Sequence, residues 1–94
     1  MISYIQKYGE PRTRNIVVAA LYVLTGKYGR RKFSATEIRH GALDLIRGFG
    51  EDGSISPETV KRVMEPINGD VLEFADRRKG TYQLKPFFRV TRLF

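Results

Sequence analysis

Apolar residues recur along the chain in a pattern that predicts helices first and a β-hairpin afterwards. The longest apolar run covers residues 16–24, and its Ala and Leu content favours a helix that continues to about Tyr28. Gly29 then stands where a C-capping glycine commonly ends a helix. Because a helix that is apolar on every side is normally covered by several neighbours, we expect this helix at the centre of the core.

The residues ahead of this helix are less regular. Residues 1–8 alternate loosely between apolar and polar side chains, a pattern that fits a short amphipathic helix or an arm. Residues 9–15 contain a Gly, a Pro and two Arg, so we predict a connection there. Thr13 or Asn15 would then cap the long helix.

A second helix is predicted over residues 35–46. Ser34 followed by Glu37 forms the capping-box pattern, and the apolar positions that follow share one face. Phe33, just before the cap, is expected to form a very short strand. Gly41 costs the helix about 1 kcal/mol relative to Ala, and we interpret it as a point of close packing with a neighbouring helix.

A third helix is predicted after a glycine-containing loop over residues 47–55. Ser56 suits the N-cap, and Pro57 suits the first helical position, where its missing N–H is not needed. Pro66 limits the length of this helix, and residues 68–70 are predicted to form a turn. The side chains expected to face the core recur with helical spacing and are Val60, Val63, Met64 and Ile67.

The last part of the pattern predicts a β-hairpin. Residues 71–76 and residues 81–85 alternate between apolar and polar side chains on either side of a basic turn, residues 77–80, that contains a glycine. Pro86 ends the second strand, and an apolar tail follows. The apolar face of the hairpin is expected to carry Leu72, Phe74, Tyr82 and Leu84.

Composition favours one domain with a polyanionic partner. The chain has 94 residues, of which 41% are hydrophobic, enough for a single modest core. Its Lys and Arg number 17 against 10 Asp and Glu, which gives a net charge of +7 and a pI near 10.1. Such a charge favours nucleic acid as a partner before an anionic membrane surface, and a merely solubilising surface is the alternative.

Several classes of site are excluded by residue usage. The absence of Cys excludes disulfides, Cys-based zinc sites and thiol catalysis, and a single histidine, His40, excludes a multi-His metal site within one chain. Residues 1–8 lack the features of a secretion signal, and the nine-residue apolar run falls short of the ~20 residues of a membrane span. We therefore expect a soluble, cytoplasmic protein without metal or cofactor.

Two segments match known sequence motifs only in part, and we reject both matches. Residues 48–53 match the glycine pattern of dinucleotide-binding folds, but that motif requires a parallel strand over residues 42–46, where the capping box predicts a helix. An EF-hand loop over residues 48–59 would place glycine or threonine at three ligand positions. No catalytic arrangement can be assembled around His40, so the sequence does not indicate an enzyme.

With these elements in place, the chain resembles a winged helix-turn-helix domain. The resemblance depends on the openings of the second and third helices, residues 34–38 and 56–60, and on residues 71–84 as the wing. It covers roughly residues 15–86 and implies an α+β fold of three helices with a C-terminal hairpin wing, within a single domain over residues 1–94.

Two features depart from this family. The turn over residues 47–55 is longer than the usual three or four residues, and Pro66 shortens the third helix. Among winged-helix proteins, this small, basic and cysteine-free chain looks similar to regulators of archaea and their viruses. That resemblance would place the protein in the cytoplasm of the cell or of a viral host.

The resemblance implies that the third helix enters the DNA major groove. Arg62 would then read guanine, a contact worth about 1–3 kcal/mol of discrimination, and Glu58 would accept from cytosine or repel phosphate. The alternative is the solvated face of an ordinary amphipathic helix. The predicted DNA contacts of this helix are Ser56, Glu58, Thr59, Lys61 and Arg62.

Further cations are predicted to contact the DNA backbone or minor groove. Those at the wing tip would do so by projecting from the hairpin, unless they only keep an edge strand soluble. Arg12 and Arg14 could form a minor-groove arm. The predicted contacts outside the third helix are Arg77, Arg78 and Lys79 in the wing and Arg30, Arg31 and Lys32 before the short strand.

We therefore expect a sequence-specific regulator that binds double-stranded DNA as a homodimer. The aromatic residues of the N- and C-terminal segments would pair the two copies, and covering the chain's own core is their alternative role. Two other functions stay open. An RNA- or ribosome-associated domain is suggested by an excess of Arg over Lys, and a winged helix can also serve only as a protein-interaction module.

Overall fold

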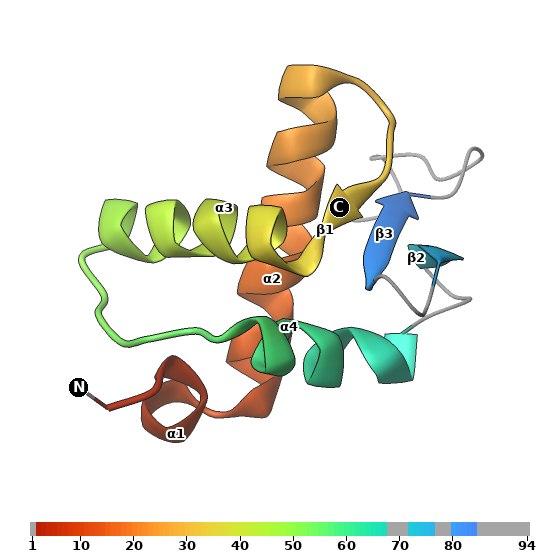
Figure 1. Cartoon of the computed structure of the whole chain (residues 1–94). Coiled ribbons are helices and arrows are strands. Elements are labelled where there is room, and N and C mark those ends of the chain that lie inside the picture. Colours follow the sequence, from red (N-terminus) through yellow and green to blue (C-terminus); the bar gives the residue numbers. More distant parts are fainter. Residues whose placement is uncertain (1, 68–71, 77–79, 85–94) are drawn as a thin grey trace.

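The computed structural model describes residues 2–67, 72–76 and 80–84 (Figure 1). This part of the chain is α+β, with helices packed beside a small antiparallel sheet. None of its helices combines the length and apolarity needed to span a bilayer. The elements are α1 (Tyr4–Tyr8), α2 (Glu10–Tyr28), β1 (Phe33–Ser34), α3 (Ala35–Gly48), α4 (Pro57–Met64), the 3₁₀ turn η1 (Glu65–Ile67), β2 (Leu72–Asp76) and β3 (Thr81–Leu84).

Helix α2 begins earlier than its apolar run. It starts at Glu10, so the connection predicted over residues 9–15 is reduced to Gly9, and residues 10–15 form the first turns of the helix. Pro11 does not oppose a helix there, because a first-turn residue needs no N–H for the helical hydrogen bonds. Thr13 is buried rather than capping, and its Oγ1 donates to the Gly9 carbonyl at 2.8 Å.

The C-terminal end of α2 confirms the predicted glycine cap, but its burial differs from the prediction. Gly29 adopts φ 85°, and its N–H donates to the Thr25 carbonyl at 2.9 Å. Helices α3 and α4 both pack across α2 (Figure 1) and bury residues such as Ala20 and Leu21. Val23, however, is 51% exposed, so α2 is not covered on every side.

Helix α3 forms as its capping box predicts. The Ser34 Oγ accepts from the Glu37 N–H at 3.1 Å, and the Glu37 carboxylate accepts from the Ser34 N–H at 3.0 Å. The close packing predicted at Gly41 is also present, since a Cβ there would lie 3.3 Å from the Ala20 Cβ. Because residues 42–46 are helical, the parallel strand of a dinucleotide-binding fold is absent from this position.

The sheet contains a strand pairing that the sequence did not predict. Strand β3 lies at its centre, with β1 and β2 antiparallel on either side. Phe33 pairs with Tyr82, so the very short strand is the third strand of the hairpin's sheet. In the hairpin, Phe74 is opposite Tyr82 and Leu72 is opposite Leu84, which confirms that these residues share a face.

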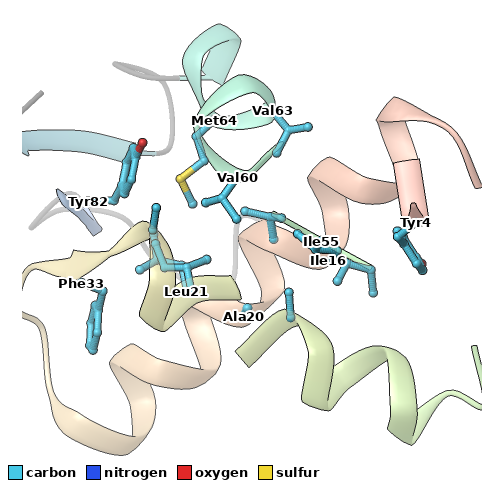
Figure 2. Close-up of a cluster of buried hydrophobic side chains, with 14 of the residues drawn as sticks. Tyr4, Ile16, Ala20, Leu21, Phe33, Ile55, Val60, Val63, Met64 and Tyr82 are labelled. Atoms are coloured by element: carbon cyan, nitrogen blue, oxygen red, sulfur yellow. The ribbon is translucent and has the colours of Figure 1, made fainter. Parts of the chain in front are cut away.

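The core lies between the three longer helices and this sheet (Figure 2). Met64 and Val60 of α4 point toward Leu21 of α2 and toward Tyr82, which joins the sheet to the helices. Burying a large aliphatic side chain stabilises a fold by about 1.5–3 kcal/mol, so this cluster fixes the position of α4 against α2 and the sheet. The turn at residues 68–70 and the tail after Leu84 lie outside the described residues.

Candidate nucleic-acid interface

Helix α4 begins where the sequence predicts, and two of its predicted DNA contacts form its cap. The Ser56 Oγ accepts from the Thr59 N–H at 3.1 Å and lies 3.0 Å from the Thr59 Oγ1. Pro57 occupies the first turn. The two hydroxyls therefore fix the N-terminal turn of the helix, and Ser56 is also exposed, so it remains accessible from solvent.

The exposed face of α4 carries no net charge of its own. Two acids and two cations are exposed along it and in the turn that follows: Glu58, Lys61, Arg62 and Glu65. The Arg62 Nη2 lies 3.8 Å from the Glu10 Oε2 at the start of α2. An exposed ion pair at that separation contributes about 0–1 kcal/mol, so the Arg62 guanidinium is easily drawn to another acceptor.

Lys61 connects this helix to the hairpin. A Cβ atom at Gly80 would lie only 2.8 Å from the Lys61 Cε, so the lysine side chain crosses to the start of β3. Gly80 is buried and adopts φ +60°, a conformation that favours glycine. It directly follows in sequence the cations Arg77, Arg78 and Lys79, which lie outside the described residues.

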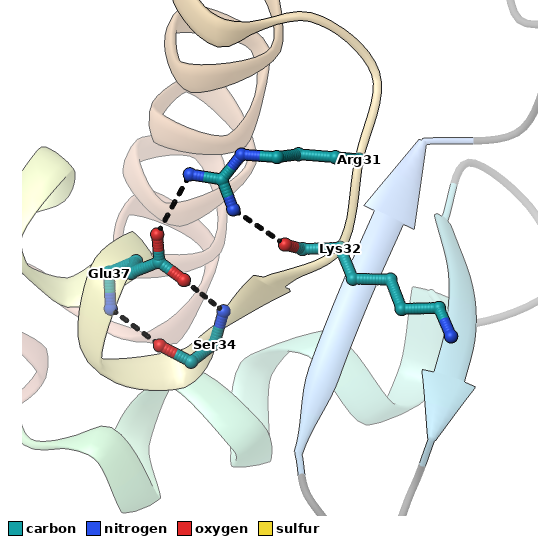
Figure 3. Close-up of polar contacts among 4 residues, drawn as sticks. All are labelled: Arg31, Lys32, Ser34 and Glu37. Atoms are coloured by element: carbon teal, nitrogen blue, oxygen red, sulfur yellow. Dashed lines mark hydrogen bonds and ion pairs between the residues drawn. The ribbon is translucent and has the colours of Figure 1, made fainter.

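Of the three cations predicted before β1, Arg31 has a structural role (Figure 3). Its guanidinium donates to the Glu37 carboxylate at 3.1 Å and to the Lys32 carbonyl at 2.9 Å, and it lies 4.2 Å from the centre of the Phe33 ring. The pKa of Glu37 is lowered, mainly by the Ser34 backbone N–H, with a further contribution from Arg31 against the opposing effect of burial.

Arg30 and Lys32 differ from Arg31. Both are exposed, and within the described part of the chain neither side chain forms an ion pair. Figure 3 shows the Lys32 side chain pointing away from the Glu37 carboxylate. Their charges are therefore available to a ligand.

The structure separates these cations from Lys61. Strand β1 runs antiparallel to β3, with Ser34 opposite Thr81 and the Ala35 N–H donating to the Gly80 carbonyl at 3.2 Å. Lys32 therefore continues toward the opposite end of β3 from Gly80. The loop before β1 and helix α4 accordingly lie at different ends of the sheet (Figure 1), so the predicted contacts of these two described segments are not adjacent.

The minor-groove arm predicted at Arg12 and Arg14 is wrong, because both residues lie in α2. The Arg12 Nη2 donates to the Glu51 Oε1 at 3.0 Å, and its Nε donates to the Tyr4 Oη at 3.1 Å. Tyr4 in turn donates to the same Glu51 oxygen at 2.9 Å. Burial would raise the pKa of Glu51, but the hydrogen bonds from Arg12 and Tyr4 lower it overall.

This cluster belongs to an N-terminal brace, residues 2–12, on the loop that leads into α4. The Tyr4 N–H donates to the Ser54 carbonyl at 2.8 Å, and the Ser54 N–H donates to the Ile2 carbonyl at 3.2 Å. Gly53 adopts φ +132°, and a Cβ there would lie 2.8 Å from the Tyr4 Cα. Lys7 pairs with Asp52, which lowers the pKa of that carboxylate.

The brace explains how a loop longer than a helix-turn-helix turn still positions α4. Tyr4 is fully buried in its own chain, so it covers the core. Sequence reasoning missed the roles of Tyr4, Arg12 and Glu51, because nothing local indicates that residues so far apart in the chain meet. Gly53 was the one available signal, since a loop glycine often marks a close backbone approach.

The described residues include no group of three or more His, Asp or Glu that could hold a metal ion, and His40 is exposed on α3. In comparisons with known proteins, no family model, no curated protein and no solved structure matches this chain. The function is therefore inferred from the geometry and charge of the surfaces described above.

Proposed function

We propose that this protein is a sequence-specific regulator that binds duplex DNA through the exposed face of α4 and the adjoining hairpin, as a winged helix-turn-helix domain. The order of its elements, α2, α3 and α4 followed by β2 and β3, supports the proposal. The observation that carries it is the contact of Lys61 with Gly80. It makes the face of α4 continuous with the start of β3, immediately after three consecutive cations in the sequence.

The two halves of this surface would contribute differently. The face of α4 has no net charge, so the hairpin cations supply the attraction to phosphate and much of the affinity. Arg62 supplies specificity by leaving Glu10 for guanine. A bidentate arginine–guanine contact discriminates by about 1–3 kcal/mol, more than an exposed ion pair at 3.8 Å contributes. Thr59 has a weaker role at the helix start.

We further propose that two copies bind together. A homodimer would present two α4 helices to successive turns of the major groove, about 34–36 Å apart. Light scattering on the purified protein tests this directly, because a dimer has twice the 10.8 kDa mass of the chain. A monomer mass at the concentrations at which DNA is bound would contradict it.

A salt titration of duplex binding tests the proposal as a whole. Fluorescence anisotropy on labelled duplex DNA should give an affinity that falls steeply with salt, and a slope near zero would contradict the proposal. The triple variant Arg77→Ala, Arg78→Ala, Lys79→Ala should lose affinity and lower the slope by about 1 for each phosphate contact removed. The matched control, Arg77→Lys with Arg78→Lys, keeps the charge and should retain binding.

A further inference from the structure

The C-terminal end of α2 exposes an aromatic ring among several cations. Tyr28 is 55% exposed at the last position of the helix. Four exposed cations flank it in the chain, one before it and three after it: Lys27, Arg30, Arg31 and Lys32. Proteins that bind single strands combine aromatic rings, on which bases stack, with cations that follow the phosphates. We call residues 27–32 the α2 end cluster.

Two of these cations lie over the ring of Tyr28. The Lys27 Nζ lies 5.5 Å and the Arg31 Cζ lies 5.8 Å from the ring centre. Arg31 is itself fixed by the Glu37 carboxylate and by the Phe33 ring. A base that stacks on Tyr28 therefore displaces Lys27 from the ring, because Arg31 has these other partners.

We propose that the α2 end cluster binds single-stranded nucleic acid, with one unpaired base stacked on Tyr28 and the flanking phosphates bound by Arg30 and Lys32. A single strand is the ligand that uses both features, because duplex bases are already stacked and cannot reach an exposed ring. An acidic peptide would use the cations but would give Tyr28 no role. The inference goes beyond the proposed duplex binding and does not depend on it.

The two surfaces are far enough apart to be tested separately. Arg62 contacts Glu10 at the first residue of α2, whereas Tyr28 is its last residue. A helix of 19 residues is about 28 Å long, so a ligand can occupy one end without touching the other. Variants at α4 or the hairpin should therefore leave the α2 end cluster intact.

Anisotropy of the full chain with labelled oligothymidylate is the central experiment. Tyr28→Ala should weaken binding by about 5- to 150-fold, the range expected for losing one stacked base. Tyr28→Phe keeps the ring and should bind like the unmodified protein. Phe49→Ala removes another exposed aromatic, 60% exposed, and should have no effect. Equal binding by Tyr28→Ala and the unmodified protein would overturn the inference.

A second set of variants separates this inference from duplex binding. Arg30→Ala with Lys32→Ala should lower the salt slope of single-strand binding by about 1.4, whereas the wing-tip triple variant should leave it unchanged. If the triple variant abolishes single-strand binding and Tyr28→Ala does not, the inference fails and duplex binding stands. If Tyr28-dependent single-strand binding persists where duplex binding is absent, the proposed function fails and the inference stands.

The same assay identifies the type of strand and excludes another polyanion. Competition by oligouridylate at lower concentration than oligothymidylate would assign the cluster to RNA, and the reverse order would assign it to single-stranded DNA. Both results support the inference. Binding to vesicles of anionic phospholipid, without binding to either oligonucleotide, would overturn it.

Discussion

The two ends of α2 carry cations in opposite situations. Near the N-terminal end, three cations are paired with acids: Arg12 with Glu51, Lys7 with Asp52 and Arg62 with Glu10. At the C-terminal end, Arg31 is paired with Glu37, whereas Lys27, Arg30 and Lys32 are exposed and form no ion pair within the described residues. Arg12 and Lys7 at the first end hold the N-terminal brace to the loop, whereas Arg30 and Lys32 at the second end are available to a ligand. Net charge alone does not make this distinction, because it counts both kinds equally.

The tyrosines at the two ends show the same contrast and give the largest expected effect. Tyr4 is fully buried, so Tyr4→Ala should lower the free energy of unfolding by about 3–5 kcal/mol. Tyr28 is 55% exposed, and Tyr28→Ala should change it by less than about 0.5 kcal/mol. Urea denaturation measures both. Similar values for the two variants would remove the distinction between a structural end and a binding end.

The close backbone approach in the brace predicts the next largest effect. Gly53→Ala adds a Cβ that would lie 2.8 Å from the Tyr4 Cα, in a backbone conformation that strains an L-residue. We expect a loss of about 2–4 kcal/mol in urea denaturation. Gly48→Ala is the matched control, since a Cβ there meets no atom within 4 Å and the position is helical. It should be neutral or stabilising by up to about 1 kcal/mol.

Substitution of Arg62 tests whether a cation paired with an acid at the N-terminal end of α2 also recognises DNA bases. With a duplex site obtained by selection from random sequences, Arg62→Ala should reduce discrimination against substituted base pairs by about 1–3 kcal/mol. Arg47→Ala, also an exposed arginine in a helix with an acid 3.7 Å away, should leave discrimination unchanged. An equal effect of both variants in competition binding would indicate a general charge effect instead of base recognition.

The smallest expected effect on stability concerns Glu37, which pairs with Arg31 near the C-terminal end of α2. Hydrogen bonding to the Ser34 N–H lowers its folded-state pKa, so its stabilising contribution is present above the ordinary pKa of 4.5. That contribution is lost as the pH falls through the folded-state pKa. Glu37→Gln should cost about 0.5–1 kcal/mol at pH 7 and flatten the stability profile below pH 4.5.

Asp44→Asn provides the control for this prediction. Its carboxylate lies on the exposed face of α3, 3.7 Å from Arg47, and the substitution should change stability at pH 7 by less than about 0.5 kcal/mol. Thermal or urea unfolding measured from pH 3 to pH 7 separates the two variants. A Glu37→Gln profile as steep as that of the unmodified protein would show that the Ser34–Glu37 box does not contribute the acid sensitivity.

Features decided within one helical turn could be predicted from the chain. The capping box at Ser34 and Glu37, the start of α4 after Ser56 and the end of α2 at Gly29 all depend on neighbouring residues, and the structure has them. The early start of α2 was missed because Pro11 was interpreted as part of a connection, although a proline in the first turn is compatible with a helix.

The candidate site shows the same division. A basic hairpin beside the third helix is predicted by the pattern alone, and the DNA-binding roles of Arg77, Arg78 and Lys79 stay predictions. The grouping of Arg30 and Lys32 with that surface could not be judged, since it depends on which strand β1 joins. Strand β1 pairs with β3, with Phe33 opposite Tyr82, although the two strands are far apart in the chain. This pairing places the loop before β1 at the end of β3 that lies away from Gly80.

The sequence by itself determined helices α3 and α4, the end of α2, the shared face of the hairpin residues and the excess of positive charge, because each follows from local spacing or from composition. Only the tertiary structure decided which charges are engaged. Arg12 and Lys7 meet acids of a distant loop because the brace binds that loop through its backbone, and Arg30 and Lys32 remain exposed at the opposite end of α2. Such contacts depend on the packing of the whole chain, which no short stretch of sequence encodes.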